Sequence, residues 1–245
     1  MRSFVVGLWL LLSCCAANAQ QSNRFSVGIS VSPDFNYRSL SNNDGSFSSG
    51  VVVDVRDDNE SWKLGYTAGP VVAYRLSDRI DLEAGILFSS KGYRYEQEML
   101  TYESQFTGTG FNGPTPAGLP SAVRFTYDHY YIDVLVKATF NLGKKRLRFC
   151  AGAGVAANVF IKEGVRYKYW YEDGTVKNDS RTSEFDYKGL ILSPQASIGV
   201  NYALNKRLRL KAEPTLRYGI TNITNTPVTG RLWNAGLNLS CFFTP

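Results

Sequence analysis

One stretch near the middle of the chain limits the possible folds more than any other feature. It runs from Leu147 to Ile161 and reads LRFCAGAGVAANVFI. Every odd position is apolar, whereas the even positions mix Arg, Cys, Gly, Ala, Asn and Phe. A period of two sustained over fifteen residues predicts one long β-strand with two unlike faces.

The same alternation recurs in seven further segments, which begin near residues 24, 62, 80, 130, 190, 208 and 233. Short links alternate strictly with long ones. The short links are 75–79, 143–145 and 205–206, and the long links are 34–61, 96–128, 163–188 and 221–230. This order predicts an all-β fold, an eight-stranded antiparallel up-and-down barrel with one plain end and one elaborated end.

Three prolines fall inside these strands, at Pro70, Pro194 and Pro214. Proline has no amide hydrogen and cannot donate to a ladder. We therefore expect a local β-bulge at each of them.

Alternation alone does not decide which face of the barrel is apolar. A soluble barrel of the lipocalin kind has its apolar face inside, around a ligand, whereas a transmembrane barrel has it outside, against lipid. The strand glycines favour the second arrangement, because all of them lie on the polar face, where a narrow lumen leaves little room for side chains. They are Gly28, Gly65, Gly69, Gly85, Gly152, Gly154, Gly199, Gly219 and Gly236.

Aromatic residues on the apolar face form two belts, as in transmembrane barrels. The belt near the short links comprises Tyr74, Phe140, Phe149, Tyr202 and Phe243, and the belt near the long links comprises Trp62, Phe88, Tyr130, Tyr218 and Trp233. From Tyr130 to Phe140 a strand tilted by about 45° covers roughly 23 Å, close to the thickness of the apolar band. The sequence therefore predicts that the apolar face contacts lipid.

The polar face carries charges of both signs, which can pair inside a narrow lumen, where unpaired charges are costly. We predict a lumen charge network formed by Asp81, Glu83, Asp133, Lys137, Arg148, Arg209, Lys211, Glu213 and Arg217.

The first nineteen residues have the pattern of a secretory signal peptide, with cleavage after Ala17-Asn18-Ala19. Residues 20–245 then form a single domain. Leu11–Cys14 also resembles a lipobox, in which Cys14 would be lipidated. Either route exports the chain, which argues against nucleic acid as a partner. The remaining cysteines, Cys150 and Cys241, lie on opposite strand faces, so we expect no disulfide between them.

At the level of family, the chain resembles the PorT-like group of small outer-membrane β-barrel proteins of Gram-negative bacteria. The resemblance rests on AGPVVAYRLSDRIDLEAGILFSSKGYRY (68–95), YYIDVLVKATF (130–140), AGAGVAANVF (151–160), LRYGITNIT (216–224) and WNAGLNLSCFF (233–243). Departures occur at Val134-Leu135, where such proteins commonly have proline, and at the terminus, which extends past Phe243. The resemblance implies an integral outer-membrane protein with extracellular long loops and periplasmic short turns. It also implies an accessory role in protein secretion or envelope assembly.

Candidate catalytic and metal-binding groups are few. His129 is the only histidine. No Gly-x-Ser-x-Gly motif accompanies it, so a hydrogen-bonded rim residue is favoured over a lipid-modifying enzyme. The acidic run Asp54–Glu60 offers oxygen ligands for Ca²⁺, but it lacks the spacing of an EF-hand loop, so a solvated loop is favoured. We predict a non-enzymatic protein without a cofactor or a metal site.

The segment after the opening strand predicts an exposed two-stranded flap. Val165–Tyr171 reads VRYKYWY, and Asp173-Gly174 then supplies a hairpin turn. The candidate interaction residues are Tyr167, Tyr169, Trp170 and Tyr171, which suit a protein or glycan partner. The alternative is a rigid loop that shields the rim. We interpret the chain as a surface interaction protein that acts through its extracellular loops.

Charge is sorted between the two ends of the predicted barrel. The long links 34–61, 96–128 and 163–188 carry net charges of −4, −3 and −1, and the three short turns together carry +6. Basic periplasmic turns suit contact with anionic outer-membrane lipid or with an acidic partner.

Overall fold

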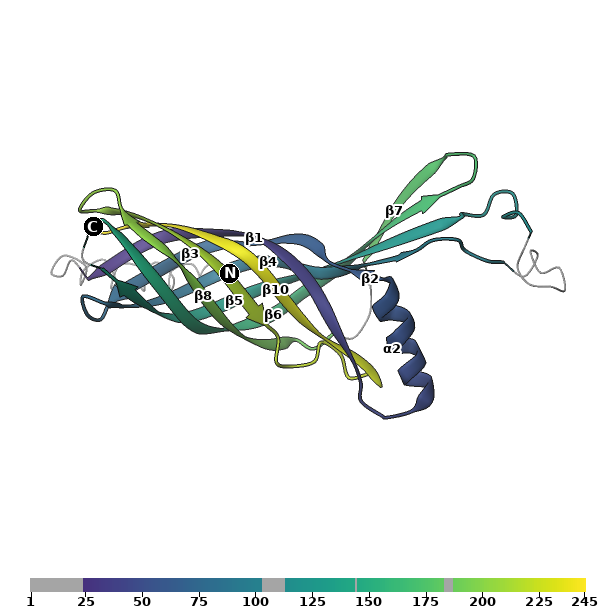
Figure 1. Ribbon diagram of the computed structural model, residues 1–245, viewed down its shortest axis with the longest axis horizontal. Helices are drawn as coiled ribbons and strands as arrows, with labels where there is room; N and C mark the ends of the chain where they lie inside the picture. Colours follow the sequence, from purple (N-terminus) through teal and green to yellow (C-terminus); the bar gives the residue numbers. More distant parts are fainter. Residues whose placement is uncertain (1–23, 103–112, 144, 183–186) are drawn as a thin grey trace, which may run out of the picture.

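The computed structural model describes residues 24–102, 113–143, 145–182 and 187–245, so the predicted signal peptide (1–19) lies outside the described residues. The secondary structure is almost entirely β (Figure 1). The elements are β1 (Phe25–Asn42), α2 (Phe47–Asn59), β2 (Glu60–Ser61), β3 (Lys63–Arg75), β4 (Ile80–Gln97), β5 (Ala122–Leu142), β6 (Leu147–Trp170), β7 (Val176–Thr182), β8 (Leu190–Ala203), β9 (Leu208–Tyr218) and β10 (Val228–Phe243).

Eight of these strands close into a ring, which confirms the predicted barrel. Each pairs antiparallel with its neighbours in the order β1, β3, β4, β5, β6, β8, β9, β10, and β10 returns to β1. The closing pairs run from Val27↔Phe243 to Asn42↔Val228. β2 and β7 lie outside the ring, on β4 and β6 respectively.

The apolar faces of the strands form the outside of the barrel. Ile29, Phe149 and Ile198 are 65%, 65% and 69% exposed, whereas Lys137 and Glu213 on the opposite face are 2% and 0% exposed. A water-soluble barrel has the reverse arrangement. The inside-out prediction is therefore confirmed.

Inward glycines allow the strands to curve closely around one another. A Cβ added at Gly199 would meet the carbonyl oxygen of Ala212 and, at 2.8 Å, the Cα of Glu213 on β9. A Cβ added at Gly69 would meet the carbonyl oxygen of Ile86 on β4. Side chains at these positions would force the backbones apart, which explains why glycine occupies the polar face.

The predicted bulges at Pro70, Pro194 and Pro214 are wrong. The register stays the same on both sides of each proline, with Ile29↔Pro70, Val155↔Pro194 and Leu237↔Pro214 as regular pairs. At each proline the ladder lacks one hydrogen bond, because proline has no amide hydrogen, and no extra residue is inserted.

A register shift instead occurs between β5 and β6. Tyr130 pairs with Lys162 and Tyr131 pairs with Phe160, so Ile161 has no partner. The extra residue exchanges the two faces of β6. Beyond it, Glu163 and Val165 turn inward and are 2% and 4% exposed.

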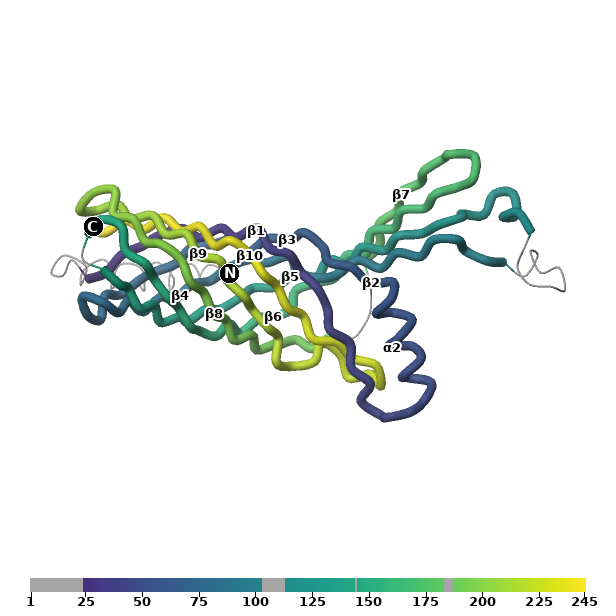
Figure 2. Tube along the Cα trace, viewed as in Figure 1, coloured from purple at the N-terminus to yellow at the C-terminus, as the bar shows by residue number. Residues whose placement is uncertain are grey.

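Four strands continue past the barrel as one sheet, which we call the projecting sheet. It consists of residues 91–97 of β4, 122–129 of β5, 162–170 of β6 and the whole of β7. Its ladders reach Gln97↔Val123, Ala122↔Trp170 and Trp170↔Val176. The sheet leaves the long-loop end of the barrel and leads away from it (Figures 1 and 2). The predicted two-stranded flap is thus two strands of a four-stranded sheet.

The long link 34–61 is more ordered than predicted. β1 continues to Asn42, and Ser46 then caps α2 by accepting a hydrogen bond at 3.2 Å from the Ser49 amide. The acidic run 54–60 is therefore the end of a helix followed by β2, which corrects its prediction as a solvated loop. Within the described ranges, no helix is both long enough and apolar enough to cross a membrane.

Candidate functional site

Four charged side chains meet in the middle of the lumen. Lys137 Nζ lies 2.7 Å from Glu213 Oε2 and 3.1 Å from Glu83 Oε2. Lys211 Nζ lies 3.1 Å from Glu213 Oε2 and also pairs with Glu83. All four residues are at most 5% exposed. We call these residues the lumen quartet; its two positive and two negative charges compensate one another in a space closed to water.

The other predicted network residues lie above and below the quartet. Asp81 accepts a hydrogen bond from Arg209 Nη1 at 2.6 Å. Asp133 pairs with Lys91 at 3.0 Å, and Arg217 pairs with Asp34 at 3.0 Å.

Arg148 is the exception among the predicted network residues, since its contact is the carbonyl oxygen of Asp78 in a turn, at 3.5 Å. Sequence reasoning missed Asp34 and Lys91 because both lie beyond the strand ends that the alternation indicated.

Aromatic rings and a buried ion pair fill the long-loop mouth of the barrel. Arg38 Nε donates to Glu60 at 3.1 Å, and the Arg38 guanidinium lies 3.7 Å from the centroid of the Tyr93 ring. Tyr93 stacks on Tyr127 with centroids 4.6 Å apart. Tyr187 donates to Glu163 Oε1 at 2.6 Å. These groups seal the lumen at this end.

His129 belongs to this seal and is fully buried. Nδ1 lies 3.5 Å from Glu163 Oε1, but neither ring nitrogen forms a hydrogen bond among the described residues, which corrects the prediction of a hydrogen-bonded rim histidine. Its ring instead packs against Tyr187 at 4.8 Å. His129 lies just outside the spanning segment Tyr130–Phe140. Burial, together with Arg38 and Lys63, lowers the pKa of His129 to about 3. A neutral, buried imidazole without a bonded hydroxyl or thiol is poorly placed to act as a general base.

Among the described residues, no group of three or more His, Cys, Asp or Glu side chains could hold a metal ion. Cys150 is buried and Cys241 is exposed, and both are free.

The projecting sheet has two chemically different faces. Its inner face continues the lumen side and carries a row of aromatic rings. The ring centroid of Tyr95 lies 5.9 Å from that of Phe125, Phe125 lies 5.2 Å from Tyr167 in an edge-to-face contact, and Tyr167 stacks on Tyr169 at 6.2 Å. Of the four predicted interaction residues, the structure thus brings Tyr167 and Tyr169 together.

The other two predicted interaction residues lie elsewhere on the sheet. Trp170 is on the opposite face, with the Arg124 and Lys168 cations each 4.9 Å from its ring. Tyr171 begins the hairpin turn, where Gly174 adopts a φ of 81°.

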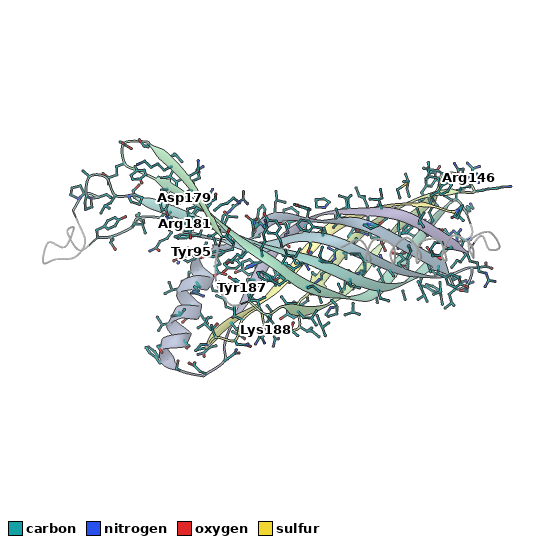
Figure 3. All side chains as sticks on the ribbon, turned by 180° about the vertical axis from the view of Figure 1, so that it is seen from behind. Tyr95, Arg146, Asp179, Arg181, Tyr187 and Lys188 are labelled. Atoms are coloured by element: carbon teal, nitrogen blue, oxygen red, sulfur yellow. The ribbon has the colours of Figure 1, made fainter. Side chains whose placement is uncertain are left out.

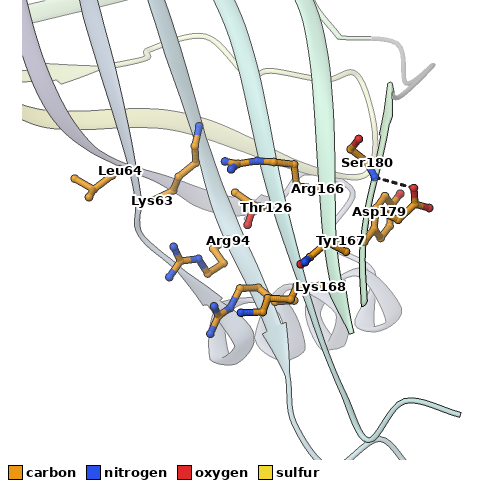
Figure 4. Close-up of a pocket in the computed structure, with 11 residues that line it drawn as sticks. Lys63, Leu64, Arg94, Thr126, Arg166, Tyr167, Lys168, Asp179 and Ser180 are labelled. Carbon is orange, nitrogen blue, oxygen red and sulfur yellow. Dashed lines mark hydrogen bonds between the residues drawn. The ribbon is translucent and has the colours of Figure 1, made fainter. Parts of the chain in front are cut away.

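The outer face of the projecting sheet holds a hollow of about 750 Å³. Five cationic side chains line it, as Figure 4 shows for four of them, and we call it the basic groove. The five cations are Lys63, Arg94, Arg124, Arg166 and Lys168. Sequence reasoning missed this groove because its members come from four strands and from links whose net charge is negative or nearly neutral.

β7 forms the free edge of the projecting sheet. It pairs with β6 alone among the described strands, and all seven of its residues are exposed. The Tyr171 amide bonds to the Thr175 carbonyl. By the alternation of an antiparallel ladder, Val176, Asn178, Ser180 and Thr182 therefore direct their backbone groups to the free edge. Figure 3 shows Asp179 and Arg181 on this strand, far from Arg146 at the short-turn end.

Residues 18–225 match the model of the family described as outer membrane protein beta-barrel domain. The chain belongs to this family. It is therefore an integral protein of the outer membrane, with the long loops and the projecting sheet outside the cell and the short turns in the periplasm. No curated protein matches the chain.

Several solved structures are similar to the chain at low sequence identity. Neisserial surface protein A (NspA) is 13% identical over 91% of this chain and 98% of its own, with a TM-score of 0.44. The attachment invasion locus protein Ail of Yersinia pestis is 11% identical over 89% and 99%, with a TM-score of 0.34. The outer membrane protease OmpT of Escherichia coli is 9% identical over 92% and 98%, with a TM-score of 0.42.

Proposed function

We propose that this protein is a non-enzymatic surface interaction protein that captures a protein or glycan partner outside the cell. The observation that carries this proposal is the projecting sheet, in which four strands continue beyond the aromatic belt and end in the exposed edge strand β7. Exposed backbone donors and acceptors on such an edge favour addition of a strand from a second protein. The aromatic face beside the edge supplies side-chain contacts through Tyr167 and Tyr169.

The sealed interior supports an interaction role over a transport role. The lumen quartet crosses the middle of the barrel, and the cluster around Tyr93 and His129 fills its outer mouth. We infer that solutes do not diffuse through this barrel and that its function resides in the extracellular part.

Capture by strand addition is tested by removing outward backbone donors from β7. Val176→Pro and Asn178→Pro each delete an amide directed to the free edge, and neither removes a bond between β6 and β7. The barrel is reconstituted in lipid nanodiscs and incubated with the secreted and surface-released proteins of its own cells. The double variant is expected to capture the partner about tenfold less strongly than the parent.

A matched control keeps the edge intact and changes a side chain on the same strand. Asn178→Thr retains the amide and should capture normally. Equal capture by the proline variant and the control would show that the edge is not the binding element. If the parent retains nothing above empty nanodiscs, the interaction function itself is refuted.

A second candidate function is an accessory role in protein secretion or envelope assembly, which the resemblance to PorT-like proteins implies. The short turns favour it, because they present exposed cations, including Arg79, Lys145 and Arg207, to the periplasm. Changing these three residues to Gln should release an acidic periplasmic partner from crosslinked cells without loss of the barrel. Unchanged crosslinks would remove this candidate.

A further inference from the structure

The position of the basic groove follows from the strand parity. On β5, even-numbered residues face lipid below the rim, as Tyr130 does, and Thr126 and Arg124 continue that face above it. On β4, Phe88 likewise faces lipid, and Arg94, also an even-numbered residue, continues that face above the rim. The bulge at Ile161 then brings Arg166 and Lys168 to this side. The groove therefore stands directly above the outer aromatic belt, on the lipid side of the wall.

Cations outnumber acids in and around the groove. Asp128 is shared by Lys63 at 2.5 Å and Arg166 at 2.8 Å, and Arg124 is paired with Glu96. Asp179 also lines the groove and is paired with Arg181 of β7 at 3.2 Å. Three acids therefore face six cations, which leaves three positive charges uncompensated.

Two of the five cations have no acidic partner. Arg94 and Lys168 make no ion pair within the described part of the chain, and the buried Nε of Arg94 has no hydrogen-bond acceptor there. A guanidinium with an open donor suits a phosphate, whose oxygens accept its hydrogen bonds in pairs.

Apolar surface adjoins the charges. Leu64 lines the groove and is 59% exposed, and the neighbouring belt residue Trp62 is 52% exposed. A ligand that fills the groove thus meets cations at one end and the lipid-facing wall at the other. A soluble anion would contact only the cations. An amphiphile would contact the cations with its headgroup and the lipid-facing wall with its acyl chains.

We propose that the basic groove binds the phosphorylated sugar headgroup of a glycolipid of the outer leaflet. Arg94 and Lys168 hold a phosphate, Trp170 lies beside the sugar, and the acyl chains run down the barrel wall past Leu64. This inference is independent of the proposed function, which concerns the edge of β7.

The test uses the full-length barrel in detergent micelles, with binding measured by native mass spectrometry. The probes are a bisphosphorylated acylated disaccharide and the same lipid without its phosphates. The groove variant is Arg94→Gln with Lys168→Gln, which leaves the buried Asp128 fully paired. The control is Lys177→Gln with Arg56→Gln, which removes the same charge from two exposed positions that do not line the groove. Retention of a heat-modifiable band in SDS shows that each variant is folded.

The parent and the control are expected to bind the phosphorylated lipid equally, and the groove variant roughly 30-fold more weakly, since each cation near an anionic surface contributes about a fivefold factor. The dephosphorylated lipid should bind weakly to all three proteins. Equal losses in both variants would overturn the proposal in favour of net charge. Displacement of the lipid by equimolar inorganic phosphate would overturn it in favour of a free-anion site.

Discussion

At the scale of single residues, the lumen quartet shows how a narrow barrel tolerates charge. Lys137 and Lys211 each contact both Glu83 and Glu213, so each charge has two opposite neighbours. Removing one member of such a group leaves a buried charge uncompensated, which costs more than the pair contributes.

Glu213→Gln is therefore expected to lower the free energy of unfolding by about 3 kcal/mol. The measurement is the urea midpoint of barrel folding in lipid vesicles, followed by tryptophan fluorescence. Adding Lys137→Met restores the balance of one cation and one anion and should recover most of the loss. If the double variant is less stable than Glu213→Gln alone, charge compensation does not explain the quartet.

Gly199 allows a second residue-level prediction, because a methyl group there would collide with the backbone of β9. Gly199→Ala should destabilise the barrel by about 2 kcal/mol, as overpacking does elsewhere. Gly50→Ala is the control, since the nearest atom to its Cβ is Asn42 Nδ2 at 3.8 Å and alanine favours a helix. The same urea titration measures both, and equal midpoints would contradict the steric account.

Individual residues were predictable from sequence only where the alternation placed them inside a strand. Glu83, Lys137, Lys211 and Glu213 lie in such segments, and their inward direction followed from parity. Asp34 follows Pro33, which hid the continuation of β1. Lys91 follows two serines, where the apolar pattern of β4 had already ended.

At the scale of elements, the bulge in β6 decides which side chains face which way outside the membrane. Nothing in Phe160-Ile161-Lys162 marks it, because the segment has no glycine or proline and each residue suits a regular strand. A tertiary contact explains the bulge. It turns Glu163 inward, where the carboxylate accepts a hydrogen bond from Tyr187 among the side chains that fill the outer mouth of the barrel.

Deleting Ile161 is expected to restore the uninterrupted alternation and to turn Arg166 and Lys168 toward the inner face. Burial of cations among the rings would then separate β6 from β7. Trypsin added to intact cells should cleave the deletion variant after Arg166 or Lys168 and spare the parent. Ile161→Val keeps the residue count and should resist like the parent; cleavage of both proteins would show that the bulge has no such role.

At the scale of the whole molecule, the eight strands and their inside-out arrangement were predictable because the signal is repeated. Each strand carries a weak alternation, but eight such segments joined by short and long links leave few other folds. The projecting sheet was not predictable to the same degree. Its strands have polar residues on one face and rings on the other, so no single apolar stripe marks them.

The closed ring leads to a prediction about the intact protein. Every barrel strand is hydrogen-bonded on both sides, so SDS at room temperature should not open it. We expect a heat-modifiable band that stays in carbonate-washed membranes and shifts in mobility only after boiling. A protein that is washed out by carbonate, with one mobility before and after boiling, would contradict a membrane barrel.

The continuity of β5 and β6 has a mechanical consequence. Both strands run from the periplasmic turn to the tip of the projecting sheet, and their ladder of backbone pairs continues across the bulge. At roughly 3.3 Å per residue, the 24 residues of β6 extend well past the apolar band. A load applied at the tip therefore acts along the strands, as shear shared by many hydrogen bonds, and does not concentrate at a hinge. The outer sheet works as a rigid lever fixed in the barrel wall.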